Sequence, residues 1–107
     1  DLLCFQGNIV IIEDSTEGTK KTVRISGRLD SVSAPELENH LNELLSDTEL
    51  LVLDLKNLEY ISSAGLRVIL GVNKKMTGNR RCVIINVRDA VMEIFEVTGF
   101  ADILTIE

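Results

Sequence analysis

The sequence predicts an α/β fold with a mixed central sheet of about four to five strands and about three to four helices. Two observations carry this prediction. Short β-rich runs near the start of the chain are typical of a hairpin, and beyond them helical stretches alternate with short apolar runs. A length of 107 residues with 45% hydrophobic residues supplies apolar surface for one compact core. We therefore expect a single domain over residues 8–107.

The N-terminal part is expected to form the hairpin. Residues 8–13 and 22–26 are rich in β-forming residues, and the polar stretch 14–21 is the expected connection between them. The first seven residues, 1–7, have two interpretations. They are either an expression-tag remnant, since they resemble the recognition scar of a tag-removal protease, or a native first strand.

A helix is predicted to start at Ser33. Ser33 and Glu36 have the spacing of a capping box, and Pro35 falls in the first helical turn. The leucines that follow recur at helical spacing and predict one buried stripe, whereas the opposite face, which includes His40, is polar and is expected to be solvated. The leucines of the stripe are Leu37, Leu41, Leu44 and Leu45.

The second half predicts a strand, a helix and a second strand. Residues 50–55 are almost continuously apolar and too short for a helix, which favours a strand covered on both faces. Ser62 and Ser63 precede a helix-forming run over 64–76, and 82–87 is a second apolar strand. Such a unit is expected to cross over with its two strands parallel.

The C-terminal part predicts one more helix and a short ending. Asp89 is placed to cap this helix and Gly99 to stop it. Residues 102–106 form either a last short strand or a packed tail.

Composition limits the kinds of partner. The chain has 17 acidic and 11 basic residues, a formal net charge of -6, and a sequence pI near 4.7. Such a charge repels phosphate backbones, so we expect no nucleic acid and no membrane as partners. No apolar run approaches the roughly 20 residues of a membrane helix and no signal peptide is recognisable, which predicts a soluble cytoplasmic protein.

Residues for catalysis or metal binding are scarce. Cys4 and Cys82 lack the spacing of a zinc site or a disulfide framework, so we expect reduced structural thiols, no metal and no cofactor. His40 is the only histidine and belongs to a different helix from the serine pair. A nucleophilic serine needs a base, and the GxSxG nucleophile elbow is absent, so the sequence predicts no enzyme.

The serine pair is the most informative feature. Ser62 and Ser63 lie where a strand region ends and a helix begins, and a helix N-terminus offers unpaired N–H groups and a partial positive charge. A phosphate on Ser63 would bring about -1.5 to -2 charges to a place that favours anions. Serine is also a favoured N-cap, and both roles can coexist, one in each serine.

These residues resemble a known family. Residues 60–70 (YISSAGLRVIL) look like the signature of the STAS domain family, in which anti-sigma factor antagonists carry a serine or threonine before the helix. Residues 27–30 (GRLD) and 34–37 (APEL) resemble the family's earlier motif, and 91–103 resembles its final helix. The chain departs from the best-known antagonists in Ser62, where they often have Asp, and in Ala64, where they often have Ser or Thr.

The resemblance implies a partner-switching cycle. The unphosphorylated antagonist would bind an anti-sigma factor that is also a serine kinase, phosphorylation would end the binding, and a phosphatase would restore it. Aligned on the motif, the phosphoacceptor is Ser63, with Ser62 as second choice. Asp30 has an alternative role as a turn carboxylate that binds local N–H groups. The implied partner-binding residues are Asp30, Ser31, Ser33, Ser62, Ala64, Gly65 and Arg67.

An alternative keeps the fold and changes the role. The same domain would serve as a protein-interaction or nucleotide-sensing module in another signalling assembly, without a link to a sigma factor. The acidic charge and the lack of a Gly-rich phosphate loop disfavour tight nucleotide binding.

Overall fold

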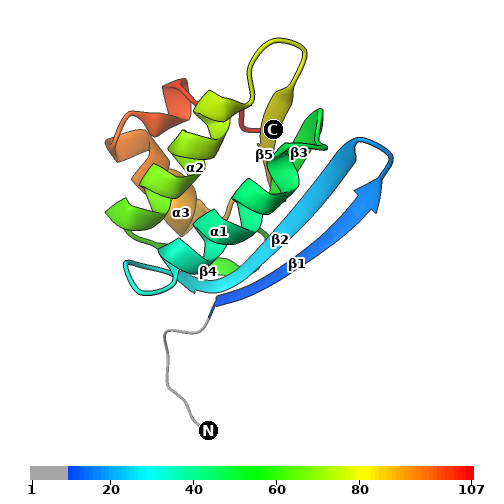
Figure 1. The fold of residues 1–107 in the computed structure, drawn as a ribbon. Coiled ribbons are helices and arrows are strands. Elements are labelled where there is room, and N and C mark those ends of the chain that lie inside the picture. The colour runs from blue at the N-terminus through cyan, green and yellow to red at the C-terminus, as the bar shows by residue number, and fades with distance from the viewer. Residues whose placement is uncertain (1–9) are drawn as a thin grey trace, which may run out of the picture.

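The computed structural model describes residues 10–107, which form a mixed sheet packed against helices (Figure 1). The sheet has five strands in the order β1-β2-β3-β5, and β4 pairs with β2. Only the β1/β2 pair is antiparallel, as the predicted hairpin requires. The predicted fold class is therefore confirmed. The strands are β1 (Val10–Glu17), β2 (Lys20–Leu29), β3 (Leu50–Asp54), β4 (Leu58–Ile61) and β5 (Arg81–Ile85).

The hairpin is longer than predicted. Residues 14–21, expected as a loop, instead continue both strands, and the turn is confined to Gly18 and Thr19 between the paired residues Glu17 and Lys20. Gly18 has φ 64°, a conformation that glycine adopts without strain. Strand pairing uses backbone groups, so the exposed end of a hairpin needs no apolar side chains. The polar residues 14–21 therefore gave no indication that the two strands continue. The predicted strand start at residues 8 and 9, and both interpretations of residues 1–7, lie outside the described residues.

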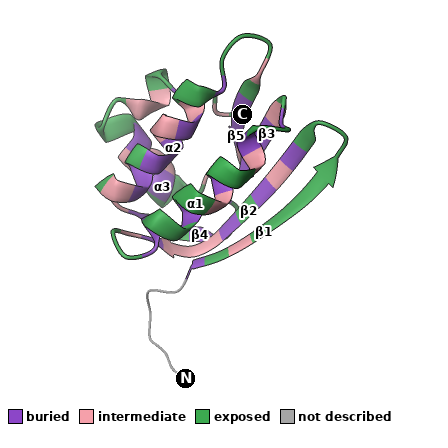
Figure 2. Cartoon of the chain, viewed as in Figure 1, coloured by how far each residue is buried: buried purple, intermediate pink, exposed green. Residues whose placement is uncertain are grey.

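Three α-helices and a 3₁₀-helix complete the fold. Each α-helix lies near its predicted position, whereas the 3₁₀-helix was not predicted. The buried residues of α1, α2 and α3 belong to one core together with buried residues of the sheet. Figure 2 colours the buried residues purple along these elements. The sheet contributes Val23, Ile25, Leu51, Leu53 and Ile84 to this core. The helices are α1 (Ala34–Leu45), α2 (Ser63–Lys75), α3 (Asp89–Val97) and η2 (Phe100–Asp102).

Two predicted burial patterns are confirmed. Leu37, Leu41 and Leu45 are buried along one stripe of α1. The centre of β3 is buried on both faces, since Leu51 and Leu53 are inaccessible and Val52 between them is only 8% exposed. Alternation of buried and exposed residues along β2 places Arg24 and Ser26 on the sheet face opposite the helices.

The presence of β4 corrects the prediction of which two strands α2 connects. This strand was not predicted, because two of its four residues are exposed and only Leu58 and Ile61 are buried. It pairs with β2, so α2 connects β4 to β5 rather than β3 to β5. The predicted parallel arrangement of β3 and β5 is confirmed.

The C-terminal segment differs in one detail. Asp89 lies in the first turn of α3 and does not cap it, because Arg88 occupies the N-cap position. Gly99 ends the helix with φ 82°, as predicted. The final residues are a packed tail with a single bridge, in which Leu104 is buried and Ile106 pairs with Ile84 of β5. Within residues 10–107, no helix has the length and apolar character that crossing a membrane requires.

Candidate functional site

The two serines at the start of α2 have different environments. Ser62 is the N-cap: its backbone is extended, and its Oγ accepts a hydrogen bond from the Gly65 N–H at 3.4 Å. The Ser62 N–H donates to the Leu29 carbonyl at 2.8 Å, which fixes the start of α2 beside the end of β2. Ser63 is the first helical residue and is exposed. One serine therefore caps the helix while the other faces solvent.

Gly65 brings α2 close to the sheet. A Cβ at this position would lie 2.8 Å from Leu29 Cγ and 2.9 Å from Ile61 Cγ1, nearer than real Cβ atoms approach. The absence of a side chain therefore lets the first turn of α2 rest on β2 and β4. This contact determines where Ser63 is presented.

The loop at residues 30–33 is organised by Asp30. Its Oδ1 accepts hydrogen bonds from the Val32 N–H at 3.0 Å and the Ser33 N–H at 3.1 Å. The pKa of Asp30 lies below its ordinary value of 3.8, chiefly because of the hydrogen bond from the Ser33 N–H. The hydrogen bonds from the Val32 N–H and the Ser33 hydroxyl lower it further. The geometry thus shows the alternative role considered for Asp30, that of a turn carboxylate that binds local N–H groups.

The predicted capping box at the start of α1 is absent. Ser33 occupies the N-cap position, but its side chain makes no capping hydrogen bond. Its buried hydroxyl instead lies 2.9 Å from the Arg28 carbonyl and accepts a hydrogen bond from the Asp30 N–H at 3.0 Å. The Ser33 hydroxyl therefore ties this loop to the end of β2, and Glu36 has no reciprocal role.

A groove of about 250 Å³ separates the N-terminal halves of α1 and α2. Its wall is partly apolar, with Val68 buried, and two charged residues of opposite sign, Glu38 and Arg67, also line it. The α1 side of this groove was not predicted from the sequence, although Ala34 and Glu38 stand four residues apart and so share a helix face. The lining residues are Ser31, Ala34, Pro35, Glu38, Ala64, Arg67 and Val68.

We call the loop 30–33, the start of α2 and this groove the docking surface. The structure brings together Ser31, Ala64 and Arg67 at the groove. Of the other predicted partner-binding residues, Asp30 and Ser62 are half-buried, while Ser33 and Gly65 are buried. Ser33 and Gly65 therefore lie under the docking surface and determine its shape.

The charge distribution along α2 suits an anion at its start. The first turn contains no acidic residue, and the last turn carries Lys74 and Lys75. Basic residues at the C-terminal end complement the helix dipole, and the N-terminal end keeps its partial positive charge. A phosphate on Ser63 would therefore meet a favourable local field.

Other reactive residues are engaged elsewhere. His40 was expected to be solvated, but its Nε2 lies 2.8 Å from Asp14 Oδ2 and its side chain is only 34% exposed. Burial raises the pKa of the Cys82 thiol to about 11, and Cys4 lies outside the described residues. Among residues 10–107, no group of three or more His, Cys, Asp or Glu side chains could hold a metal ion.

Comparison with known proteins agrees with this architecture. The anti-sigma-B factor antagonist of Staphylococcus aureus (strain NCTC 8325 / PS 47) is 33% identical over 95 residues, covering 87% of this chain and 88% of the relative. A crystal structure of an anti-sigma factor antagonist from Mycobacterium paratuberculosis has a TM-score of 0.85 with 22% identity, covering 92% of this chain and 85% of the other.

A second solved structure is the anti-sigma factor antagonist SpoIIAA in its unphosphorylated form. Its TM-score is 0.74 with 14% identity, and the match covers 91% of this chain and 88% of SpoIIAA. At this identity the likeness concerns the fold. The sequence model of the STAS domain matches residues 11–107. With its sheet order, its serine-capped α2 and this match over nearly its whole length, the chain belongs to the STAS domain family.

Proposed function

We propose that this protein is an anti-sigma factor antagonist that binds an anti-sigma factor through the docking surface and is released when Ser63 is phosphorylated. The observation that carries the proposal is the exposed Ser63 hydroxyl at the first turn of α2. The names of the relatives support the general role, since the Staphylococcus protein and both solved structures are anti-sigma factor antagonists. The proposed setting is the cytoplasm, where sigma factors act.

The docking surface is suited to a protein partner rather than a small substrate. The groove combines apolar residues with one acidic and one basic side chain, so a partner can insert an apolar group while Glu38 and Arg67 fix its orientation by charge. Asp30 and Ser33 hold the loop in one conformation before the partner arrives. A preorganised loop reduces the entropy lost on binding.

Phosphorylation would act on this surface by charge. Transfer of the γ-phosphoryl group of ATP to Ser63 Oγ releases ADP and the hydroxyl proton, and leaves about -1.5 to -2 charges on the protein. The N-terminal end of α2 stabilises that charge, so the fold is retained. The partner surface that accepted a neutral hydroxyl now meets a bulky dianion, which repels acidic groups and requires desolvation. The proposed kinase is the anti-sigma factor itself, and a separate phosphatase resets the cycle.

A phosphorylation assay tests the acceptor. Incubation with the anti-sigma factor kinase of the source organism and ATP is expected to add one phosphate, which mass spectrometry places on Ser63. Ser63→Ala is expected to abolish the modification. The matched control is Ser62→Ala, which changes the neighbouring hydroxyl and leaves the acceptor in place. Phosphate on Ser62, or on Ser63→Ala, would contradict the assignment.

A binding assay tests the charge switch. Ser63→Asp is expected to weaken binding of the anti-sigma factor at least tenfold, about 1.4 kcal/mol, with an unchanged melting temperature. Asn79→Asp adds the same charge at an exposed position beyond the far end of α2 and serves as the control. Calorimetry that gives equal affinity for Ser63→Asp and the control would rule out the proposed switch.

A further inference from the structure

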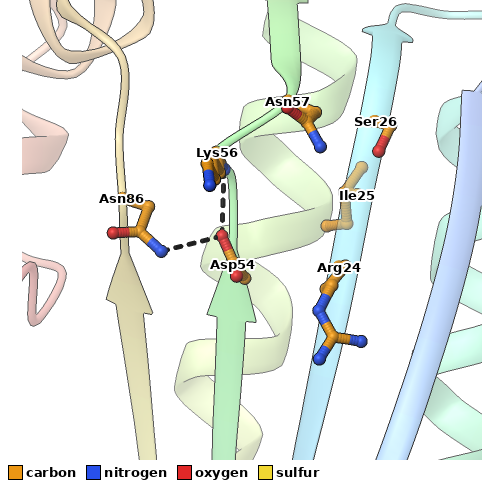
Figure 3. Close-up of a pocket in the computed structure, with 7 residues that line it drawn as sticks. All are labelled: Arg24, Ile25, Ser26, Asp54, Lys56, Asn57 and Asn86. Carbon is orange, nitrogen blue, oxygen red and sulfur yellow. Dashed lines mark hydrogen bonds between the residues drawn. The ribbon is translucent and has the colours of Figure 1, made fainter.

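A polar cavity of about 310 Å³ opens within the sheet, away from the docking surface (Figure 3). It exists because β2 changes neighbours: its pairing with β3 ends at Arg24 and Asp54, and its pairing with β4 begins at Gly27 and Leu58. In open α/β sheets, ligands bind beyond the carboxyl ends of strands, where neighbouring strands diverge. The lining residues are Arg24, Ile25, Ser26, Asp54, Lys56, Asn57 and Asn86.

Two cations of the cavity lack an acidic partner. Arg24 and Lys56 are exposed, and neither forms an ion pair with a described residue. Together with Asp54 they give the cavity a net charge of +1, from two positive groups and one negative group. The whole chain carries -6. A cavity of opposite sign to the rest of the molecule concentrates small anions.

Asp54 supplies an acceptor at the same place. Its Oδ1 accepts hydrogen bonds from the Lys56 N–H at 3.0 Å and from Asn86 Nδ2 at 3.1 Å, and both are drawn in Figure 3. Its Oδ2 makes no hydrogen bond with the described residues. The cavity therefore offers one free carboxylate oxygen, which suits a ligand hydroxyl as donor.

The backbone at Asn86 is the second unusual feature. Asn86 has φ 58° and is the only non-glycine residue with positive φ among residues 10–107. Asparagine adopts this left-handed conformation more readily than other non-glycine residues, and such positions cluster at binding sites. Here the side chain is held by Asp54 while the residue lines the cavity. The unusual backbone thus coincides with the polar groups of the cavity.

We propose that this cavity binds a small sugar phosphate. Arg24 and Lys56 bind the phosphate by charge-assisted hydrogen bonds. Asp54 Oδ2 accepts from a hydroxyl of the sugar, and the Asn57 amide and Ser26 hydroxyl add neutral hydrogen bonds. The net positive charge favours an anion over a zwitterion such as an amino acid, and the volume is near the lower limit of pockets for small ligands.

The cavity is separate from the docking surface. Arg24 and Ser26 lie on the face of β2 opposite Val23 and Ile25, which pack in the core shared with the helices. The lining of the cavity shares no residue with the groove and does not include Ser63.

Nuclear magnetic resonance titration of the full chain tests the proposal, with glucose 6-phosphate as the probe. Amide signals of Ser26, Asn57 and Asn86 are expected to shift progressively and to give one dissociation constant. Glucose and inorganic phosphate are the two matched arms, and each is expected to bind at least tenfold more weakly than the probe. Equal binding of inorganic phosphate, or shifts centred on α2, would overturn the proposal.

Charge-neutralising variants complete the test. The double variant Arg24→Gln/Lys56→Gln is expected to weaken glucose 6-phosphate binding at least tenfold. The control Lys20→Gln/Lys74→Gln removes two exposed lysines outside the cavity and is expected to leave the affinity unchanged. The same melting temperature for both double variants shows that folding is intact. Equal loss in both would mean a general charge effect, and loss in neither would mean that the cavity is not the site.

Discussion

Replacing Gly65 by alanine is expected to destabilise the protein, whereas the same replacement at Gly71 in the same helix is expected to stabilise it. The Gly65 Cβ would lie 2.8 Å from Leu29 Cγ and 2.9 Å from Ile61 Cγ1, and both neighbours are buried and unable to move aside freely. At Gly71 a Cβ meets no atom within 4 Å. The two positions therefore separate steric effects from helix propensity.

The magnitudes follow from these contacts. Overpacking a core contact costs about 1–3 kcal/mol. Alanine recovers up to about 1 kcal/mol of helix propensity, and less in a first turn, so Gly65→Ala is expected to lose about 1–2 kcal/mol. Gly71→Ala is expected to gain about 0.5–1 kcal/mol. The two variants then differ by about 1.5–3 kcal/mol.

Urea unfolding followed by far-ultraviolet circular dichroism measures this difference, since the chain has no tryptophan for fluorescence. With a slope of about 1–3 kcal/mol/M, the two unfolding midpoints are expected to lie about 0.5–3 M apart with similar slopes. If Gly65→Ala is as stable as Gly71→Ala, α2 does not rest on β2 and β4 at this point. The position assigned to Ser63 would then be wrong as well.

Two further predictions concern titratable groups. Asp30→Asn removes the charged acceptor of the Val32 and Ser33 N–H groups and is expected to lower the thermal midpoint at pH 7. Because the pKa of Asp30 is lowered on folding, its contribution to stability is present above the ordinary pKa of 3.8 and is lost as pH falls through the lower folded pKa. The difference in thermal midpoint between the variant and the unchanged protein should therefore vanish in stronger acid. A gap that persists in strong acid would contradict the hydrogen-bond argument. The second prediction concerns Cys82, whose pKa is raised to about 11 by burial. In a Cys4→Ser variant, Cys82 should react with iodoacetamide at pH 7 only after denaturation, and mass spectrometry measures this labelling. Rapid labelling of the native protein would disprove the burial of Cys82.

The predictable part of the fold is the part whose buried side chains follow a regular pattern in the sequence. Helix α1 shows its leucine stripe in the sequence because every third or fourth residue meets the core, and β3 shows a continuous apolar run because it is buried centrally. The ends of β1 and β2 over residues 14–21, and β4, gave no such signal. Their pairing rests on backbone hydrogen bonds, while most of their side chains are exposed.

The functional residues were predictable only where the signal comes from residues adjacent in the sequence. Ser62 and Ser63 were found because helix capping depends on a few adjacent residues. The polar cavity was not found, because Arg24, Asp54 and Asn86 come from three different strands or strand ends and meet only through the register of the sheet. The available signal was a polar residue at the end of each of two apolar strands: Asp54 is the last residue of β3, and Asn86 directly follows β5.

The two edges of the sheet have consequences for self-association. At one edge the tail covers β5: the Ile84 N–H donates to the Thr105 carbonyl at 2.9 Å, and the Glu107 N–H donates to the Ile84 carbonyl at 2.8 Å. At the other edge, among residues 10–107, no strand pairs with the outer side of β1, which instead carries exposed acidic side chains such as Glu13 and Glu17.

An unpaired strand edge is a template for adding strands from other molecules, and like charges oppose that addition. Two copies that approached through β1 would bring their acidic side chains together. Self-association through the edges of the sheet is therefore disfavoured, because the C-terminal tail covers β5 and the acidic side chains of β1 repel one another.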